Sequence, residues 1–346
     1  MSQNFDPDFE KLRQRAEKIR AAKREIRPMA WTIVLNVLIV NVLIVAAIVV
    51  YFYAQHFDEL LNYFAENQDF DLYTARIYEM AANFLLSDQY SDFVSILQMV
   101  VPIIALWPIW HYARKHKLNP LEREPVTQLG VGGFAELFAA MLGINVIGSL
   151  GVLLTETLFN GAGYSIILDV IPDDTPLSHW LLSIYAVTLA PLTEEYVYRG
   201  VVLKHLRRFG DHFAILASSI LFGLMHGNLS QILSACLIGY FLAYVRIKTG
   251  SWWVCVLLHA ANNLYALLMS ELTDSLSLMM ANLVGVADWI IFGALGVFCL
   301  WRVIKRYGST GAEKDEVGLS VLFNAPVMVL MVFYFYEIIS FVRPLG

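Results

Sequence analysis

The sequence predicts an all-α protein built as a polytopic bundle of transmembrane helices, and three observations predict it. Hydrophobic residues make up 58% of the 346 residues and charged residues only 16%, whereas soluble domains average about a quarter charged. The apolar residues gather in long runs that are uncharged or interrupted by a single acid. Lysine and arginine gather between alternate runs. We therefore expect an integral multi-pass protein of the cell membrane.

The apolar runs predict about nine spans, because about 20 apolar residues cross the hydrocarbon core of a bilayer. Most runs are about one such helix long. The run 212–245 is longer and carries the turn signal Gly227-Asn228 near its middle, so we expect it to form two helices. In chain order the runs are 28–57, 93–113, 137–155, 175–193, 212–245, 249–270, 275–301 (interrupted by Asp288) and 318–336.

The positions of lysine and arginine predict a cytoplasmic N-terminus, since these residues favour the cytoplasmic side of a membrane. With alternating spans, the inner segments hold 22 of the 24 basic residues, and only Arg76 and Arg343 fall outside them. The outer loop 58–92 is acidic instead, so the net charge of -6 combines two opposite poles and gives no support for nucleic-acid binding. The inner segments are 1–27, 114–127, 199–211, 246–248 and 302–317.

Two segments outside the spans have helical patterns of their own. The segment 1–27 carries charges of both signs at helical spacing, which predicts a solvated cytoplasmic helix; the alternative is a docking arm for anionic lipid. In the loop 58–92 the apolar residues recur at helical spacing. We expect short amphipathic helices that lie on the outer surface of the membrane.

Six polar residues lie inside segments that otherwise indicate membrane-spanning helix. A central Glu or Arg in a transmembrane helix costs about 3 kcal/mol on insertion scales, so such residues are candidates for a functional site. The six are Glu194, Glu195, Arg199, His226, His259 and Asn263.

The spacing of Glu194, Glu195 and Arg199 predicts different surroundings for the two adjacent carboxylates. Neighbouring residues on a helix diverge by about 100°, so Glu194 and Glu195 face different surroundings. Arg199 follows Glu195 at i+4, the favourable order for an ion pair, which leaves Glu194 as a free carboxylate that can accept a proton. The structural alternative is a simple salt bridge with a spare glutamate near the cytoplasmic interface.

The distances along the helices bring the remaining polar residues to the same depth. Glu194 and His226 lie at similar distances from the inner turn near 209–210, so an antiparallel hairpin makes them level. Phe222 precedes His226 by one turn and is expected to form an apolar wall beside it. His259 and Asn263 share a helix face at i, i+4 and reach the same level.

The motifs Glu-Glu-x3-Arg, Phe-x3-His and His-x3-Asn begin at Glu194, Phe222 and His259. In this order they resemble the three motifs of the type II CAAX prenyl endopeptidase and bacteriocin-processing family (CPBP, or Abi) of intramembrane proteases. The resemblance covers roughly 191–263. It implies a division of the chain into a charged N-terminal segment 1–27, N-terminal helices 28–174, a catalytic core 175–271 and C-terminal helices 272–346.

The resemblance also implies roles for the residues. Glu194, with His226 beside it, would activate a water, while His259 and Asn263 would donate hydrogen bonds to the oxyanion of peptide-bond hydrolysis. The ion pair of the first motif would hold its helix in register. A mechanism without metal is favoured, because the His-Glu-x2-His signature is missing; the alternative is Zn²⁺ held by the same four residues.

Two other classes of function stay open on the sequence alone. One is a catalytically silent immunity or scaffold protein whose polar cluster binds a membrane peptide. The other is a proton-coupled transporter, which would need further charges along a path. Asp288 and Glu337 are the other acids within spans, and they are expected to be a helix contact and an interface residue. Neither the substrate, prenylated tail or unmodified peptide, nor the oligomeric state is indicated.

Overall fold

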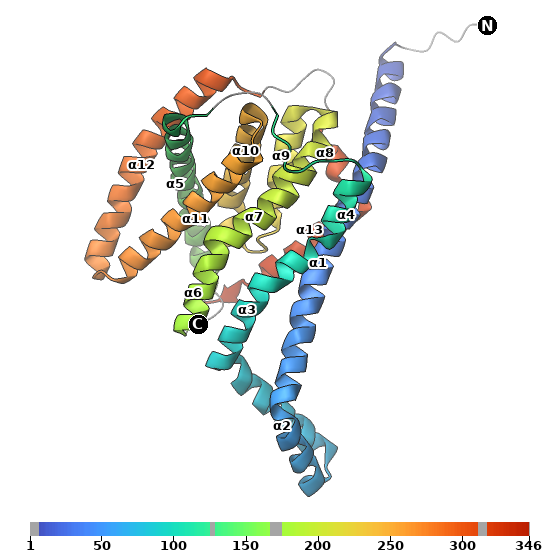
Figure 1. Ribbon diagram of the computed structural model, residues 1–346, viewed down its shortest axis with the longest axis vertical. Coiled ribbons are helices and arrows are strands. Elements are labelled where there is room, and N and C mark those ends of the chain that lie inside the picture. The colour runs from blue at the N-terminus through green and yellow to red at the C-terminus, as the bar shows by residue number, and fades with distance from the viewer. Residues whose placement is uncertain (1–6, 125–128, 167–174, 311–316, 346) are drawn as a thin grey trace, which may run out of the picture.

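The computed structural model describes residues 7–124, 129–166, 175–310 and 317–345, and it confirms the all-α fold class (Figure 1). A short antiparallel ribbon pairs Tyr164 with Pro344 and Ser165 with Arg343, which joins two distant parts of the chain. The elements are α1 (Pro7–Asn67), α2 (Phe70–Leu85), α3 (Asp88–Ala105), α4 (Trp107–Lys115), α5 (Val131–Gly161), β1 (Tyr164–Ser165), α6 (Pro176–Ile184), η1 (Tyr185–Leu189), α7 (Ala190–Glu195), η2 (Tyr196–Val202), α8 (Leu203–Leu206), η3 (Arg207–Phe209), α9 (Asp211–Leu224), α10 (Leu229–Thr249), α11 (Trp252–Asp274), α12 (Leu278–Tyr307), η4 (Leu319–Leu322), α13 (Ala325–Ser340) and β2 (Arg343–Pro344).

Six helices of the described residues are long and apolar enough to cross a membrane, so the expected count of about nine spans is not confirmed. The six are α1, the run α3 to α4, α5, α10, α11 and α12. The predicted spans in 175–193, 212–226 and 318–336 correspond to shorter pieces. Helices α9 and α13 have 14 and 16 residues. The helical run 176–209 is divided into short segments by turns of π-helix, described below.

The charged N-terminal segment and the first span form one continuous helix, α1, of 61 residues. Its charged part is held by pairs one turn apart, such as Arg13 with Glu10 at 3.3 Å. The predicted boundary at residue 27 is therefore not a break in the backbone. Residues 1–6 of that segment lie outside the described residues.

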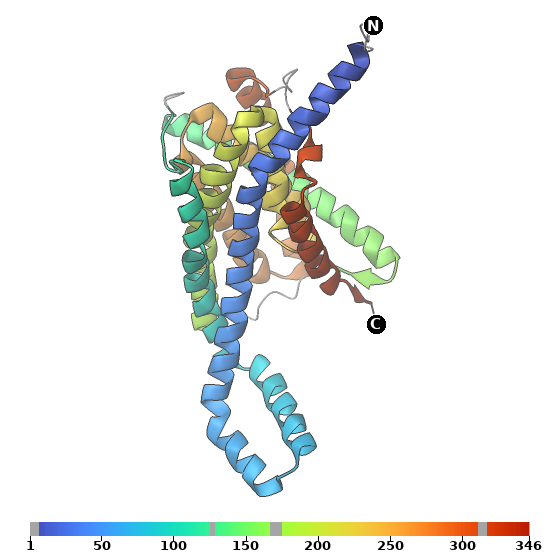
Figure 2. The same ribbon diagram turned by 90° about the vertical axis from the view of Figure 1, so that its right-hand side faces the viewer.

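The outer loop 58–92 differs from its prediction. Instead of short helices lying on a surface, the end of α1 and helix α2 form an antiparallel hairpin that projects beyond the bundle (Figure 2). Its inner faces bury Phe52 and Leu60 against Met80 and Phe84. The apolar faces of the two helices thus cover each other in part, while Leu61, Phe64 and Leu85 stay exposed.

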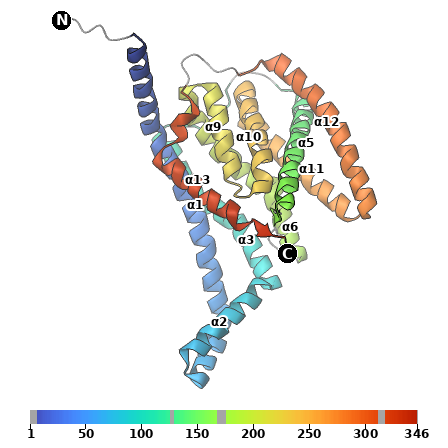
Figure 3. The same ribbon diagram turned by 180° about the vertical axis from the view of Figure 1, so that it is seen from behind.

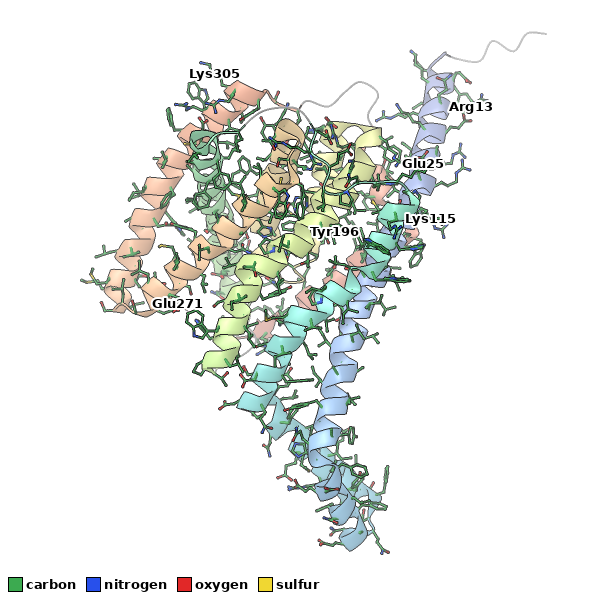
Figure 4. The ribbon with its side chains drawn as sticks, viewed as in Figure 1. Arg13, Glu25, Lys115, Tyr196, Glu271 and Lys305 are labelled. Carbon is green, nitrogen blue, oxygen red and sulfur yellow. The ribbon has the colours of Figure 1, made fainter. Side chains whose placement is uncertain are left out.

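The basic segments lie together at one end of the molecule. The start of α1 and the ends of α4, α8, α10 and α12 all reach this end, and Figure 4 shows Arg13, Lys115 and Lys305 there. This is the arrangement that alternating spans require, and the identity of the side as cytoplasmic stays a prediction. Arg199 does not belong in the count of basic residues on this side, because its side chain lies inside η2 and is 1% exposed. Residues 125–128 and 311–316 of these segments lie outside the described residues.

Helix α5 packs against α10 and α12 and closes one side of the bundle, as seen from behind in Figure 3. The contact of α5 with α12 is close at Gly143 and Gly296, since a Cβ at Gly143 would lie 2.6 Å from the Cα of Gly296. Small residues at such crossings allow helix backbones to approach. Helices α9, α10 and α11 form the rest of the frame around the polar residues.

Candidate active site

Helix α7 carries both glutamates and is flanked by two π-helical segments, η1 and η2. Single π turns inside α-helices are frequent at functional sites. In η1 the amide of Ala190 donates to Tyr185 five residues back. The carbonyl of Ala186 would receive the next amide in this register, but that residue is Pro191, which has no N–H. Asn263 on α11 supplies the donor instead, with its Nδ2 at 2.8 Å from the Ala186 carbonyl.

The ion pair expected at i, i+4 is present and fully buried. Arg199 Nη1 lies 2.9 Å from Glu195 Oε1, and the two side chains are 1% and 0% exposed. Arg199 Nη2 also donates to the carbonyl of Gly239 on α10 at 3.2 Å. The guanidinium lies over the ring of Phe222, 4.2 Å from its centroid. Arg199 therefore ties η2 to α9 and α10.

Glu195 has a second partner that the spacing argument missed. His259 on α11 places its Nδ1 at 2.9 Å from the same Oε1 atom of Glu195. The carboxylate thus stands between Arg199 and His259, rather than serving Arg199 alone. When Nδ1 donates to Glu195, the other ring nitrogen, Nε2, points away from this buried pair. The tautomer follows from the carboxylate partner, which can only accept.

Glu194 has different surroundings from its neighbour. Its side chain is 17% exposed, and its Oε2 lies 3.9 Å from His259 Nε2. It is therefore partly open, as the divergence of adjacent residues on a helix predicts. The two nitrogens of His259 consequently face two different carboxylates, Glu195 through Nδ1 and Glu194 through Nε2.

His226 lies in the turn that follows α9, and not inside a helix as its apolar surroundings suggested. Its Nδ1 contacts the carbonyl of Phe222 at 3.0 Å. Gly227 then adopts a left-handed φ of 64°, and Asn228 caps α10 by accepting from the amide of Gln231. The predicted split of the run 212–245 is therefore observed. Among the described contacts, Glu194 approaches His259 rather than His226.

Phe222 forms more than a wall beside His226. Its ring meets His226 edge to face at 5.2 Å and His259 at 5.9 Å, while Arg199 covers its face. The residue is 1% exposed. One aromatic ring thus contacts a side chain from each of the three motifs, which fixes their relative positions.

The candidate residues surround a cavity of about 450 Å³, here called the polar cavity. It lies between α5, α7, α9, α10, α11 and α12, and Glu194 and the two histidines line it together with Asn263. The lining is Leu142, Asn145, Val146, Ser149, Glu194, Phe222, His226, Gln231, Ser234, Ala235, Ile238, His259, Asn262, Asn263, Tyr265, Ala266, Asp288, Trp289 and Phe292.

The sequence reasoning missed two asparagines of this cavity. Asn145 of α5 donates a hydrogen bond to Asn262 of α11, which in turn lies 3.4 Å from Asn263. Asn145 is a polar residue within the apolar run 137–155, so the intramembrane-polar criterion could have found it. Asp288 was expected to be a helix contact. It accepts a hydrogen bond from Tyr265, and it also lines the cavity.

The described residues contain no ready-made cluster of metal ligands. Within residues 7–124, 129–166, 175–310 and 317–345, no three His, Cys, Asp or Glu side chains converge as ligands. Nδ1 of His259 contacts Glu195 and Nδ1 of His226 contacts a backbone carbonyl, so Nε2 is the nitrogen of each ring that a metal would use. The choice between a mechanism without metal and Zn²⁺ on the four motif residues therefore stays a prediction.

The fold and this centre define a class of protein, a polytopic membrane helix bundle with a carboxylate and two histidines at an internal cavity. Residues 176–265, from the start of α6 into α11, match the family of type II CAAX prenyl endopeptidases, Rce1-like. All three motifs fall within this segment, so the resemblance stated from the motifs is confirmed.

A curated relative is the Bacillus subtilis (strain 168) protein named "Putative membrane peptidase YdiL". The two sequences are 23% identical over 176 residues, which is 51% of this chain and 70% of the relative. No solved structure matches the chain. Helices α1 to α5 and α12 to α13 lie outside the family segment.

Proposed function

We propose that the protein is an intramembrane endopeptidase that hydrolyses a peptide bond in a membrane-associated peptide or protein tail. The similarity to a family of membrane proteases supports the reaction class. The polar cavity within a bundle of apolar helices supports a site at membrane depth. In the proposed arrangement residues 175–271 form the catalytic core, and the N-terminus is cytoplasmic in the cell membrane.

The observation that carries the proposal is the contrast between two adjacent carboxylates. Glu195 is completely buried between Arg199 and His259, whereas Glu194 is partly open and lines the polar cavity. Glu194 has no Lys or Arg partner among the described residues, and such a carboxylate can accept a proton from water. Glu194 is therefore the general base of the proposed reaction.

The reaction has two proton transfers that return Glu194 to its starting state. Glu194 takes a proton from a water, and the water oxygen bonds to the carbonyl carbon of the substrate, whose oxygen becomes an oxyanion. When this intermediate collapses, the C–N bond breaks and Glu194 returns the proton to the leaving nitrogen. The products are a new carboxylic acid and a new amine, which become a carboxylate and an ammonium by proton exchange with water.

His259 is suited to the oxyanion because of the two carboxylates that flank it. With Nδ1 donating to Glu195, Nε2 carries a hydrogen only when the ring is an imidazolium. Once Glu194 has taken the proton, Glu195, Arg199 and an imidazolium carry one net positive charge, which the oxyanion balances. In this state Nε2 can donate to a developing oxyanion in the polar cavity.

Asn263 and His226 complete the proposed centre. One hydrogen of the Asn263 amide is used on Ala186, which orients the side chain and leaves its second hydrogen as a donor. His226 has Nδ1 on a backbone carbonyl, so its Nε2 is the nitrogen available in the cavity. It would orient the attacking water beside Glu194.

The test is cleavage of a membrane peptide by purified protein in liposomes, comparing wild type, Glu194→Gln and the control Glu271→Gln. Glu271 is a half-exposed acid on α11 outside both cavities. We expect cleavage by wild type and control and none by Glu194→Gln. A silent immunity or scaffold protein would bind the peptide equally in all three and cleave it in none.

A further inference from the structure

Glu194 also borders a second cavity, of about 270 Å³, on the side of α7 and η2 that faces α1, α3 and α13. We call it the acidic cavity. Glu194 is the one residue shared by the described linings of the two cavities. Most of the lining is apolar and comes from helices outside the family segment. The lining is Asn36, Val37, Val40, Asn41, Pro102, Leu106, Tyr185, Thr193, Glu194, Val197, Tyr198, Met225, Phe333, Tyr334 and Glu337.

The polar groups of this cavity include two carboxylates and two amide oxygens that can accept hydrogen bonds, beside hydroxyls that can both donate and accept. Asn36 donates its amide to the Ala105 carbonyl at 2.6 Å, and Asn41 donates to the Val37 carbonyl at 3.0 Å. Each asparagine therefore keeps its side-chain oxygen as an acceptor. The charged groups of the lining are the carboxylates of Glu194 and Glu337, and the described lining contains no Lys, Arg or His.

Two buried tyrosines of the lining have hydroxyls without partners. Tyr198 and Tyr334 are each 5% exposed, and neither hydroxyl has a hydrogen-bond partner within the described part of the chain. Neither hydroxyl is among the fully buried side-chain atoms that lack a partner, so both oxygens keep some accessible surface. Such hydroxyls in a cavity wall are available to a ligand.

Glu337 lies on α13 and is half-buried, with no ion pair among the described residues. Its Oε2 lies against Gly227, where a Cβ would approach it to 2.5 Å. Gly227 follows His226 in the turn after α9, so this carboxylate is next to the proposed centre. An acid at membrane depth without a counter-charge is expensive and marks a functional position.

We infer that the acidic cavity is a substrate subsite that takes a cationic side chain, lysine or arginine, close to the peptide bond that is cut. This inference rests on the proposed function. An ammonium offers three donors and a guanidinium five, which matches the two carboxylates, the amide oxygens and the hydroxyls of the lining. An anionic group would instead face two acids without a basic partner. The volume lies just below the roughly 300–1,000 Å³ of whole-ligand pockets, which suits one side chain.

The first arm of the test measures binding and needs no protease activity. The probes are octylamine, octanol and octanoate, which share a chain and differ in the head group, added to purified full-length protein in detergent. We expect octylamine to bind wild type more tightly than the other two, with a loss of roughly tenfold to a hundredfold in Glu337→Gln, as for a hydrogen bond to a charged group. Glu66→Gln, at an exposed acid of α1, is the matched control and should bind like wild type.

The inference is overturned if wild type binds octylamine no better than octanol, or if Glu337→Gln binds it as wild type does. Because this arm reads binding alone, its outcome is independent of whether the protein cleaves peptides.

The second arm uses quenched fluorescent membrane peptides in liposomes that carry lysine, leucine or glutamate at one position, scanned along the peptide. Wild type should prefer lysine at one position, Glu337→Gln should lose that preference, and Glu337→Lys should shift it to glutamate. An unchanged lysine preference in Glu337→Gln overturns the subsite. A wild type that cleaves no peptide contradicts the proposed function instead, and the octylamine result still decides the subsite.

Discussion

The two faces of helix α7 differ in their surroundings, although each carries one of two adjacent glutamates. On one side, Glu195 is locked between Arg199 and His259 with no exposure to solvent. On the other, Glu194 opens to two cavities and has no cation closer than the ring of His259 among the described residues. The rotation of about 100° between neighbours on a helix is enough to give one carboxylate a structural task and the other a reactive one.

The contrast teaches that burial in a membrane protein does not by itself identify a reactive acid. Glu195 is the more buried of the pair, yet its Oε1 atom is held by Arg199 and His259. Glu194 is less buried, and it has no Lys or Arg partner among the described residues, so it can accept a proton from a water. The predictions below test this division from the largest expected effect to the smallest.

Arg199→Ala should destabilise the fold by about 3–5 kcal/mol, because it leaves the buried charge of Glu195 without its cation. Glu194→Ala should cost far less, since that side chain has no fixed partner. Thermal unfolding in detergent measures both variants. Equal unfolding temperatures would contradict the division between the two sides of α7.

Asn263→Ala should lower the cleavage rate about 10²- to 10³-fold, the usual loss for one oxyanion donor. It should keep more activity than Glu194→Gln or His226→Ala, because the base remains. Steady-state kinetics on one peptide substrate compares the three variants. Wild-type rates in Asn263→Ala would remove this residue from the proposed centre.

Gly143→Ala should destabilise the protein by about 1–3 kcal/mol, as overpacking does, because its Cβ would meet the backbone of Gly296. Gly285→Ala on α12 is the control, since a Cβ there meets nothing within 4 Å. Chemical or thermal unfolding distinguishes them. A neutral Gly143→Ala would mean that the close contact of α5 with α12 does not support the wall of the polar cavity.

Glu66→Cys should leave stability within about 0.5 kcal/mol, as surface changes do, and report the side of the membrane. An impermeant thiol reagent should label it from outside the cell, because the hairpin of α1 and α2 is the predicted outer loop. The parent protein, with its three native cysteines, gives the background. Labelling only from the cytoplasmic side would reverse the topology.

Much of the fold could be predicted because it depends on local sequence. Apolar runs located the long helices α1, α5, α10, α11 and α12, and Gly227-Asn228 located the turn between α9 and α10. The ion pair of Glu195 with Arg199 followed from their spacing alone. The count of nine spans is not confirmed. Among the described residues six helices are long and apolar enough to cross a membrane, whereas α9 and α13 are short and the run 176–209 is divided.

The remainder depends on contacts between distant residues, which spacing does not show. The contact of His259 with Glu195 joins α11 to α7, and the bond of Asn263 to Ala186 depends on a π turn next to Pro191. The projecting hairpin of α1 and α2 arises because their apolar faces pack on each other. Glu337 was expected to be an interface residue, and only the packing of α13 brings it beside Gly227.

The most direct test of the account is a paired measurement of cleavage rate and unfolding temperature in Glu194→Gln and Glu195→Gln. Gln keeps the shape of either side chain but cannot accept a proton or balance a cation. Glu194→Gln should abolish cleavage while peptide affinity and unfolding temperature stay close to wild type. Glu195→Gln should lower stability by about 3–5 kcal/mol, because Arg199 is left buried without its carboxylate. If wild type cleaves the peptide and Glu194→Gln cleaves it at the same rate, the account is contradicted.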